Sequence, residues 1–187
     1  MATQRILWQW LDGSGHEFAQ LSLQNGSWRI AGTALLAHEG RPCRLSYRLT
    51  CDASWQTQAA HVTGRLGGAR VAVDLARDDA GDWLLNGQRC AEVAGCMDID
   101  LNFSPVTNLL PIRRLALPIG QAAEVRAAWL RFPSFALEPL DQVYRRVGEH
   151  LYRYEAVASG FTADLTLNAA GFVTRYGDIW EAQAIGE

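Results

Sequence analysis

Residues 96–117 read CMDIDLNFSPVTNLLPIRRLAL and contain the densest run of unusual chemistry in this sequence of 187 residues. Two acids, Asp98 and Asp100, alternate with apolar residues, and this period of two predicts a strand over residues 97–101. The run then changes character, because polar residues are followed by two prolines and two consecutive arginines. Residues 96–117 therefore join a strand to a segment that is not a strand.

The second half of this run predicts the helix of the fold, near residues 104–115. Ser104 can cap such a helix, because its hydroxyl accepts a hydrogen bond from a free backbone amide of the first turn. Pro105 then suits the first helical position, where no amide hydrogen is needed. Pro111 lies inside the segment and is expected to kink or restart the helix.

On either side of this run the sequence reads as short strands, because apolar and polar residues alternate between turn signals. Asn25-Gly26 and Asn86-Gly87 are the hairpin signals, since Asn-Gly favours a two-residue turn between antiparallel strands. A strand over residues 88–93 is expected after the second of these turns.

Residues 136–146 fit both a helical stripe and a strand, and their β-branched and aromatic content favours the strand. The whole sequence then contains more than a dozen strands and one helix. We predict a mostly β (α+β) fold, a long antiparallel sheet that rolls around the single helix to bury its inner face. No linker or repeat interrupts the pattern, so one domain over residues 1–187 is expected.

The composition narrows the class of protein. Hydrophobic residues make up 49% and charged residues 20%, which is typical of a globular chain. The net charge of −3 gives no basic field for nucleic acid, and all 17 cationic residues are arginines. No apolar run reaches the roughly 20 residues of a membrane span, and the first residues do not form a signal peptide. A cytoplasmic location is therefore expected.

Seven tryptophans suit a β-rich interior or an apolar cavity. Four cysteines lack the CxxC spacing of a zinc or redox site, so free buried thiols are expected. Asp98-x-Asp100-x-Asn102 opens like a calcium loop, but Phe103 and Leu109 stand where glycine and glutamate are required. No metal and no cofactor are predicted.

Asp98 and Asp100 have two interpretations. On a strand they point to one face, roughly 7 Å apart, and that separation could serve hydrolysis by paired carboxylates. Alternatively they form ion pairs with Arg113 and Arg114, or cap the following helix.

The two arginines themselves have three interpretations: structural partners of these acids, an anion clamp for phosphate or carboxylate, or a solvated surface pair.

The remaining polar and aromatic candidates could have either a ligand-binding or a structural role. Ser104, Thr107 and Asn108 could contact a ligand, but no GxSxG motif accompanies them, and capping or turn roles are favoured. The aromatic residues of the second half are most simply core residues. Among these, Trp129 and Trp180 could line a cavity if the rolled sheet leaves one.

Several motifs together carry a family resemblance. Residues 98–115 read DIDLNFSPVTNLLPIRRL, of which TNLLPIRRL is the most specific part. AWLRFP follows at 128–133, then QVY at 142–144, YRY at 152–154, and GFV at 171–173 before Tyr176 and Trp180. Over essentially the whole chain these motifs resemble the bacterial glycolipid-binding family.

The resemblance implies a spiral β-roll, a sheet of about fifteen strands wrapped around one helix, and it implies ligand binding more than catalysis. A non-enzymatic protein that binds a lipid, glycolipid or other amphipathic small molecule is therefore the leading hypothesis. Aromatic side chains would hold the apolar part of the ligand, and arginine with Asn108 would hold its head. The candidate ligand-binding residues are Asp98, Asp100, Thr107, Asn108, Arg113, Arg114, Trp129 and Tyr144.

Two other hypotheses stay open. One is a small hydrolase that uses Asp98 and Asp100. The other is a structural interaction protein, in which the exposed edges of an unclosed sheet pair two chains into a homodimer.

Overall fold

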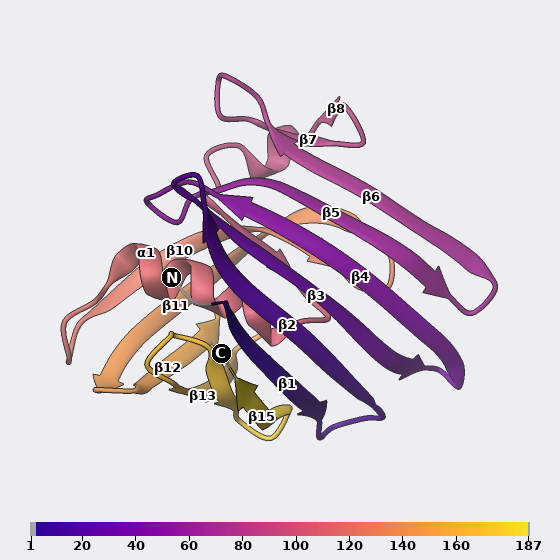
Figure 1. The fold of residues 1–187 in the computed structure, drawn as a ribbon. Coiled ribbons are helices and arrows are strands. Elements are labelled where there is room, and N and C mark those ends of the chain that lie inside the picture. The colour runs from indigo at the N-terminus through magenta and orange to yellow at the C-terminus, as the bar shows by residue number, and fades with distance from the viewer. Residues whose placement is uncertain (1–2, 187) are drawn as a thin grey trace.

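In the computed structural model, which describes residues 3–186, all the strands belong to one sheet of fifteen (Figure 1). The strands of the first half are β1 (Gln4–Trp10), β2 (Gly15–Gln24), β3 (Ser27–His38), β4 (Arg41–Cys51), β5 (Thr57–Leu66), β6 (Ala69–Arg77), β7 (Trp83–Leu85) and β8 (Gln88–Arg89). Those of the second half are β9 (Asp98–Leu101), β10 (Ala122–Arg131), β11 (Ala136–Gly148), β12 (Leu151–Ala156), β13 (Phe161–Leu167), β14 (Val173–Tyr176) and β15 (Trp180–Gly186). The helical elements are the 3₁₀ turns η1 (Ala91–Val93) and η2 (Pro105–Asn108) and the helix α1 (Leu109–Leu115).

The strand order places the two ends of the chain at the middle of the sheet. It runs β8-β7-β6-β5-β4-β3-β2-β1-β15-β14-β13-β12-β11-β10-β9. Every pairing is antiparallel except that of β9 with β10, which is parallel. The chain thus builds one half outward from β1, crosses over through residues 90–97, and builds the other half back toward β15.

The sheet wraps around the helical segment because both of its halves have apolar inner faces. In β4, buried Leu45, Tyr47 and Leu49 alternate with exposed Arg44 and Arg48. The helical segment supplies buried residues to two hydrophobic clusters: Leu109 and Leu110 join the larger one, and Ile112 joins the smaller one. Figure 1 shows the broad layer of β1–β6 on one side of α1 and β10–β13 on the other.

The sheet stays open, and β9, the strand at one of its two edges, turns inward. Ile99 and Leu101 on one face of β9 are buried, and so is Asp98 on the other face. Thr57 of β5 ties β9 to the opposite half of the sheet: its amide donates to the carbonyl of Met97 at 3.0 Å, and its hydroxyl accepts from the amide of Ile99 at 3.3 Å. Because β9 at one edge of the sheet contacts β5 of the opposite half, the sheet rolls in on itself as a spiral.

The predicted fold class is confirmed, and so is the strand at 136–146. The predicted helix is confirmed as η2 followed by α1: Ser104 Oγ accepts from the amide of Val106 at 3.1 Å, and Pro105 follows. Pro111 falls in the first turn of α1, where a missing amide hydrogen leaves no bond unmade.

The hairpin signals are also confirmed. Asn25 and Gly26 have φ values of 51° and 78°, and Asn86 and Gly87 have 50° and 80°, the left-handed conformations that such turns need.

The strand expected over 88–93 is wrong beyond Arg89. Residues 91–93 form the turn η1 instead. The physical reason is burial, because the chain bends inward so that Val93 and Cys96 enter the core beside Trp83. The Trp83 indole then donates to the carbonyl of Cys96 at 2.9 Å.

A glycine in the inner face of the sheet lets one tyrosine cross a strand. Tyr47 pairs with Gly32 of β3, and its hydroxyl reaches beyond that strand to donate to Glu17 Oε1 of β2 at 2.5 Å. A Cβ atom on Gly32 would lie 2.3 Å from the Tyr47 hydroxyl oxygen and 2.6 Å from the carbonyl oxygen of Phe18. Gly32 therefore keeps the path open for this hydrogen bond.

Gly32→Ala should lower the free energy of unfolding by about 1–3 kcal/mol, because the ring must move and Glu17 loses a donor. Gly68→Ala is the matched control, since nothing lies within 4 Å of a Cβ there. Urea denaturation of both variants checks the difference. Equal stability of the two variants would contradict this role of Gly32.

Candidate functional site

A cavity of about 460 Å³ lies between the two halves of the roll. Its walls come from β1 and β3 on one side, from β9–β15 on the other, and from the segment that precedes α1. The aromatic residues in this lining are Trp10, Phe103, Trp129, Phe132, Tyr154, Phe161, Tyr176 and Trp180. Polar residues in it include Asp12, His38, Asp100, Asn102, Ser104 and Asn108. The chamber is thus mostly aromatic, with Asp12 and His38 on the side of β1 and β3, and with Asp100, Ser104 and Asn108 forming a polar wall on the other side.

The aromatic wall is built by strand pairing. Trp10 of β1 is the direct partner of Trp180 of β15, and their rings stack with centroids 6.0 Å apart. Tyr176 of β14 is in turn the strand partner of Trp180. Tyr154 of β12 lies edge-on to Tyr176 at 5.9 Å and close to Phe161 at 6.1 Å. Ring faces and ring edges therefore both reach the chamber.

Asp100 is the charged group of the polar wall. It lies beside Trp129, because the parallel register of β9 and β10 places the two residues opposite each other. The amide of Gln142 donates to Asp100 Oδ2 at 2.8 Å and to the Tyr154 hydroxyl at 3.1 Å. Burial raises the pKa of Asp100 to about 6, and the hydrogen bond from Gln142 works against that rise.

Asn108 is fixed at the end of η2 so that its amide borders the cavity. Its Oδ1 accepts from the Tyr144 hydroxyl at 2.8 Å, and its Nδ2 donates to the carbonyl of Pro105 at 3.1 Å. Tyr144 itself is buried behind Asn108 and lies outside the lining. Its role in this arrangement is to orient the amide.

Ser104 connects the cavity to a buried carboxyl group. Its hydroxyl donates to Glu17 Oε1 at 2.6 Å, the same oxygen that Tyr47 contacts. Burial raises the pKa of Glu17 to about 8 despite these two donors. Within residues 3–186, Glu17 Oε2 is buried without a hydrogen-bond partner. Near neutral pH, Glu17 therefore holds its proton for most of the time.

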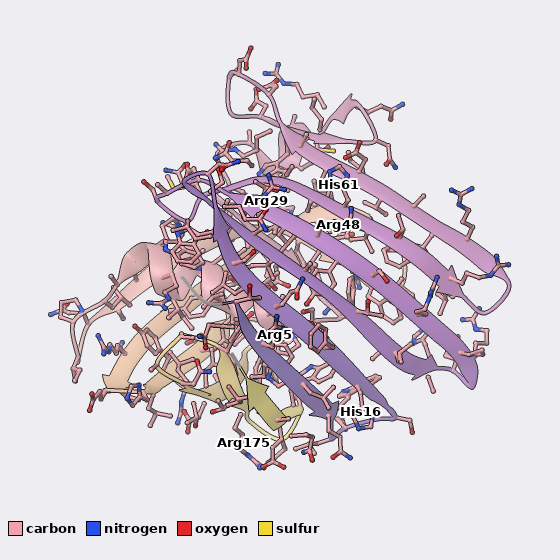
Figure 2. All side chains as sticks on the ribbon, in the orientation of Figure 1. Arg5, His16, Arg29, Arg48, His61 and Arg175 are labelled. Atoms are coloured by element: carbon pink, nitrogen blue, oxygen red, sulfur yellow. The ribbon has the colours of Figure 1, made fainter. Side chains whose placement is uncertain are left out.

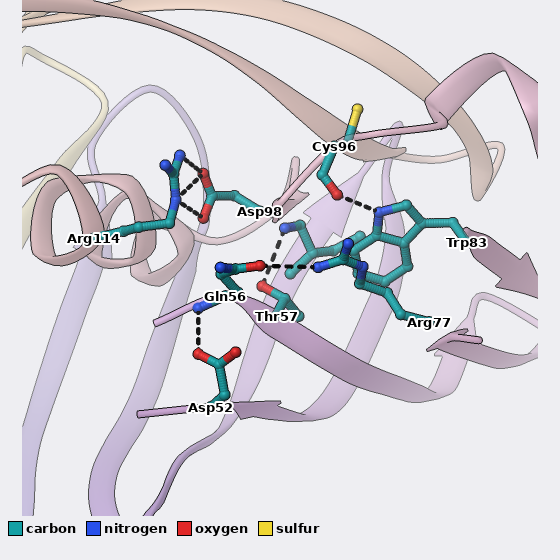
Figure 3. A network of polar contacts seen from close by, with 9 residues as sticks. Asp52, Gln56, Thr57, Arg77, Trp83, Cys96, Asp98 and Arg114 are labelled. Atoms are coloured by element: carbon teal, nitrogen blue, oxygen red, sulfur yellow. Dashed lines mark hydrogen bonds and ion pairs between the residues drawn. The ribbon is translucent and has the colours of Figure 1, made fainter. Parts of the chain in front are cut away.

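The paired acids and arginines do not act as one cluster. Arg114 of α1 contacts both oxygens of Asp98, with Nη2 at 2.5 Å and Nε at 3.1 Å and 3.2 Å (Figure 3). Asp98 is 1% exposed and Arg114 is 17% exposed. Burial raises the pKa of Asp98, and the Arg114 guanidinium opposes that rise. The ion pair is thus largely buried, and both carboxylate oxygens of Asp98 already accept hydrogen bonds from Arg114.

Arg113 turns the other way, toward the loop that follows β13. Its Nη2 donates to the carbonyl of Ala170 at 2.5 Å, and its guanidinium lies 5.6 Å from the centre of the Trp55 ring. The Thr107 hydroxyl accepts from the amide of Leu101 at 3.2 Å.

Of the eight candidate residues, the structure places Asp100, Asn108 and Trp129 in the lining of the cavity. Tyr144 supports this group from behind, whereas the other four lie outside the lining: Asp98, Thr107, Arg113 and Arg114. Ligand contacts by all eight remain predictions.

Sequence reasoning missed Glu17 and Gln142, although a signal for each was present. Each is a polar residue at a position where the period of two predicts an inward-facing side chain. Glu17 precedes inward-facing Ala19 on β2, and Gln142 lies between inward-facing Leu140 and Tyr144 on β11.

A family described as "Putative glycolipid-binding" matches residues 5–182. The chain belongs to this family. The resemblance inferred from the motifs of residues 98–115 is thereby confirmed. A search of curated proteins found no match.

A solved structure agrees with this glycolipid-binding family assignment. The crystal structure of a DUF1089 family protein from Pseudomonas aeruginosa has a TM-score of 0.76 and 32% sequence identity. The likeness covers 88% of this chain and 91% of that protein. In the described part of this chain, no helix is long and apolar enough to cross a bilayer. The same residues contain no group of three His, Cys, Asp or Glu side chains that could hold a metal ion.

Arg114→Met should lower the free energy of unfolding by about 3–5 kcal/mol, because it leaves the buried Asp98 carboxylate without its partner. Arg113→Met should change it by no more than about 1 kcal/mol, since Arg113 is exposed. Urea denaturation compares the two variants. Equal losses would show that the two neighbouring arginines have equivalent structural roles.

Glu17 should make the protein less stable as pH rises. Its folded-state pKa of about 8 lies above the ordinary value of 4.5, so the folded state holds the proton more tightly. The free energy of unfolding then falls between these two pH values, by up to about 1.4 kcal/mol per pH unit.

Glu17→Gln should remove this contribution. Denaturation of both proteins at pH 5.5, 7 and 8.5 measures it, and the variant should gain relative to the parent as pH rises. Asp98 and Asp100 titrate in both proteins and cancel in the comparison. A difference that does not change with pH would contradict a buried, proton-bearing Glu17.

Proposed function

We propose that the protein binds, without catalysis, an amphiphile whose apolar part fills the aromatic chamber and whose head meets the Asp100 wall. The carrying observation is the cavity itself: its volume of about 460 Å³ falls in the range of small-molecule sites. Its lining combines stacked tryptophans with a few polar groups, which is the arrangement that orients an amphipathic ligand. The name of the family supports the same ligand class.

The polar wall favours a neutral, sugar-like head over a phosphate. Asp100 offers a carboxylate, Asn108 an amide and Ser104 a hydroxyl, groups that exchange hydrogen bonds with sugar hydroxyls. The Arg131 guanidinium lies over the Trp129 ring, 5.4 Å from its centre, and the opposite face of this ring can pack against the C–H face of a sugar. Among the described residues that line the cavity there is no arginine, so an anionic head would meet the Asp100 carboxylate without a strong counter-charge.

The hydrolase hypothesis loses support from the same geometry. It needs Asp98 and Asp100 together at a substrate, but Arg114 holds Asp98 away from the lining. A homodimer joined through sheet edges and a cytoplasmic location remain predictions. Sedimentation at several protein concentrations tests the first of them.

Asp100→Ala should weaken the binding of octyl β-D-glucoside about tenfold, because hydrogen bonds to a charged group are lost. Asp164→Ala is the matched control, since Asp164 pairs with Arg153 on the exterior. Isothermal titration measures both. Leu140→Trp, which places a larger side chain in the lining, should also reduce affinity.

Melting curves of each variant establish that its fold is intact. Mass spectrometry of molecules extracted from the purified protein should reveal a glycosylated lipid. Octyl phosphate that binds more tightly than octyl glucoside would refute the preference for a neutral head. If neither compound binds and no lipid is extracted, the proposal itself is wrong.

A further inference from the structure

The outward face of β1–β6 carries arginines that form no ion pair with a carboxylate of residues 3–186, although the chain has a net charge of −3. Figure 2 shows several of these side chains, together with two histidines, spread over this face. The outward-facing arginines are Arg5, Arg29, Arg44, Arg48, Arg65 and Arg70. The acid on the same face is Asp74, which already pairs with His61 at 2.9 Å.

The strand register sorts this face into rows. One cationic row crosses the sheet as Arg5, Gln20, Ala31, Arg48 and His61 and ends on β6 at Asp74. A second cationic row crosses it as His16, Leu35, Arg44, Arg65 and Arg70. The neutral row between them is Leu7, Phe18, Thr33, Ser46 and Thr63. A hollow of about 450 Å³ follows the neutral row.

The second cationic row has an energetic cost in the isolated protein. Arg44 lies directly opposite Arg65, and Arg65 lies directly opposite Arg70. Like charges in such cross-strand pairs are destabilising. In residues 3–186, neither Arg44 nor Arg70 makes an ion pair, and Arg65 donates only to the carbonyl of Gly68, at 2.8 Å. An anionic partner would offset this repulsion.

Three exposed arginines on β10 and β12 are accompanied by acids. On β10 and β12 the exposed arginines face a carboxylate of the neighbouring strand: Arg126 meets Asp141 at 3.5 Å, and Arg153 meets Asp164 at 2.5 Å. Arg145 of β11 is also exposed without an ion pair among residues 3–186, but it is a single residue, whereas six outward-facing arginines share the face of β1–β6.

We propose that the outward face of β1–β6 docks on the surface of an anionic phospholipid bilayer. A broad sheet face presents its cations in one layer, which matches a plane of lipid phosphates. Phe18 is 42% exposed and Leu35 is 54% exposed within this cationic field. Such apolar side chains enter the boundary between head groups and acyl chains of a bilayer.

The docking face and the cavity meet at one end of β3. Leu35 points outward beside Arg44, and the next residue, Leu36, lines the cavity. If this face contacted a bilayer, β3 alone would separate the membrane from the cavity at this end of the strand. The inference does not depend on which ligand the chamber holds.

Co-sedimentation with vesicles tests the proposal on the full chain. The protein should bind phosphatidylglycerol–phosphatidylcholine vesicles at low salt, bind phosphatidylcholine vesicles weakly, and release from both as salt rises. Arg44→Gln, Arg65→Gln and Arg70→Gln together should weaken the first interaction by on the order of 100-fold. Arg126→Gln, Arg131→Gln and Arg153→Gln together form the control, with an equal change of charge.

The triple variant of the face should melt at the same temperature as the parent or higher, because repulsion is removed, and its affinity for octyl β-D-glucoside should be unchanged. No binding of the parent to anionic vesicles would overturn the proposal. Equal losses in the two triple variants would also overturn it, since net charge alone would then be responsible. Binding to single-stranded DNA without binding to vesicles would assign the face to nucleic acid instead.

Discussion

The ion pair between Asp98 and Arg114 is the constraint on which the interior of the roll depends. β9 pairs in the sheet only with β10, so its position is set mainly by what its side chains contact. Arg114 fixes Asp98 from the helix, and Thr57 fixes the backbone of β9 from the opposite half of the sheet. A buried ion pair contributes modestly to net stability, but leaving either partner alone is costly. The pair therefore selects one arrangement of strand and helix, and this arrangement presents Asp100 to the cavity.

Polar groups inside the roll follow a common rule: each lies where an apolar residue would fit the pattern, and each is held by a neighbour. Gln142 holds Asp100, Tyr144 holds Asn108, and Ser104 with Tyr47 holds Glu17. Burial raises the pKa of both Asp100 and Glu17, but to different values, about 6 and about 8. At neutral pH the Asp100 carboxyl group in the cavity lining is thus mostly ionised, whereas the Glu17 carboxyl group behind Ser104 is mostly protonated.

Local signals predicted the architecture, whereas contacts between distant segments had to be observed. The Asn-Gly turns and the Ser104-Pro105 helix start depend only on neighbouring residues, so the sequence contains them in full. The divergence of Arg113 and Arg114 depends on Asp98 and on Ala170, which the fold brings to opposite sides of α1. The turn at 91–93 likewise depends on burial of Val93 in a core formed by remote strands. Pattern alone could mark Glu17 and Gln142 as unusual, but it could not supply their partners.

The central pairing of β1 with β15 has a consequence for synthesis. The ribosome makes β1 before β15, so the middle of the sheet is completed only when residues 180–186 have emerged. Until then the edge of β1 has free backbone groups beside an apolar inner face, a state that invites pairing with other chains. The nascent chain must therefore keep its first half in solution, as an unfinished sheet, while the 90 residues between Arg89 and Trp180 are translated. Folding of this roll therefore has to wait for the synthesis of β15.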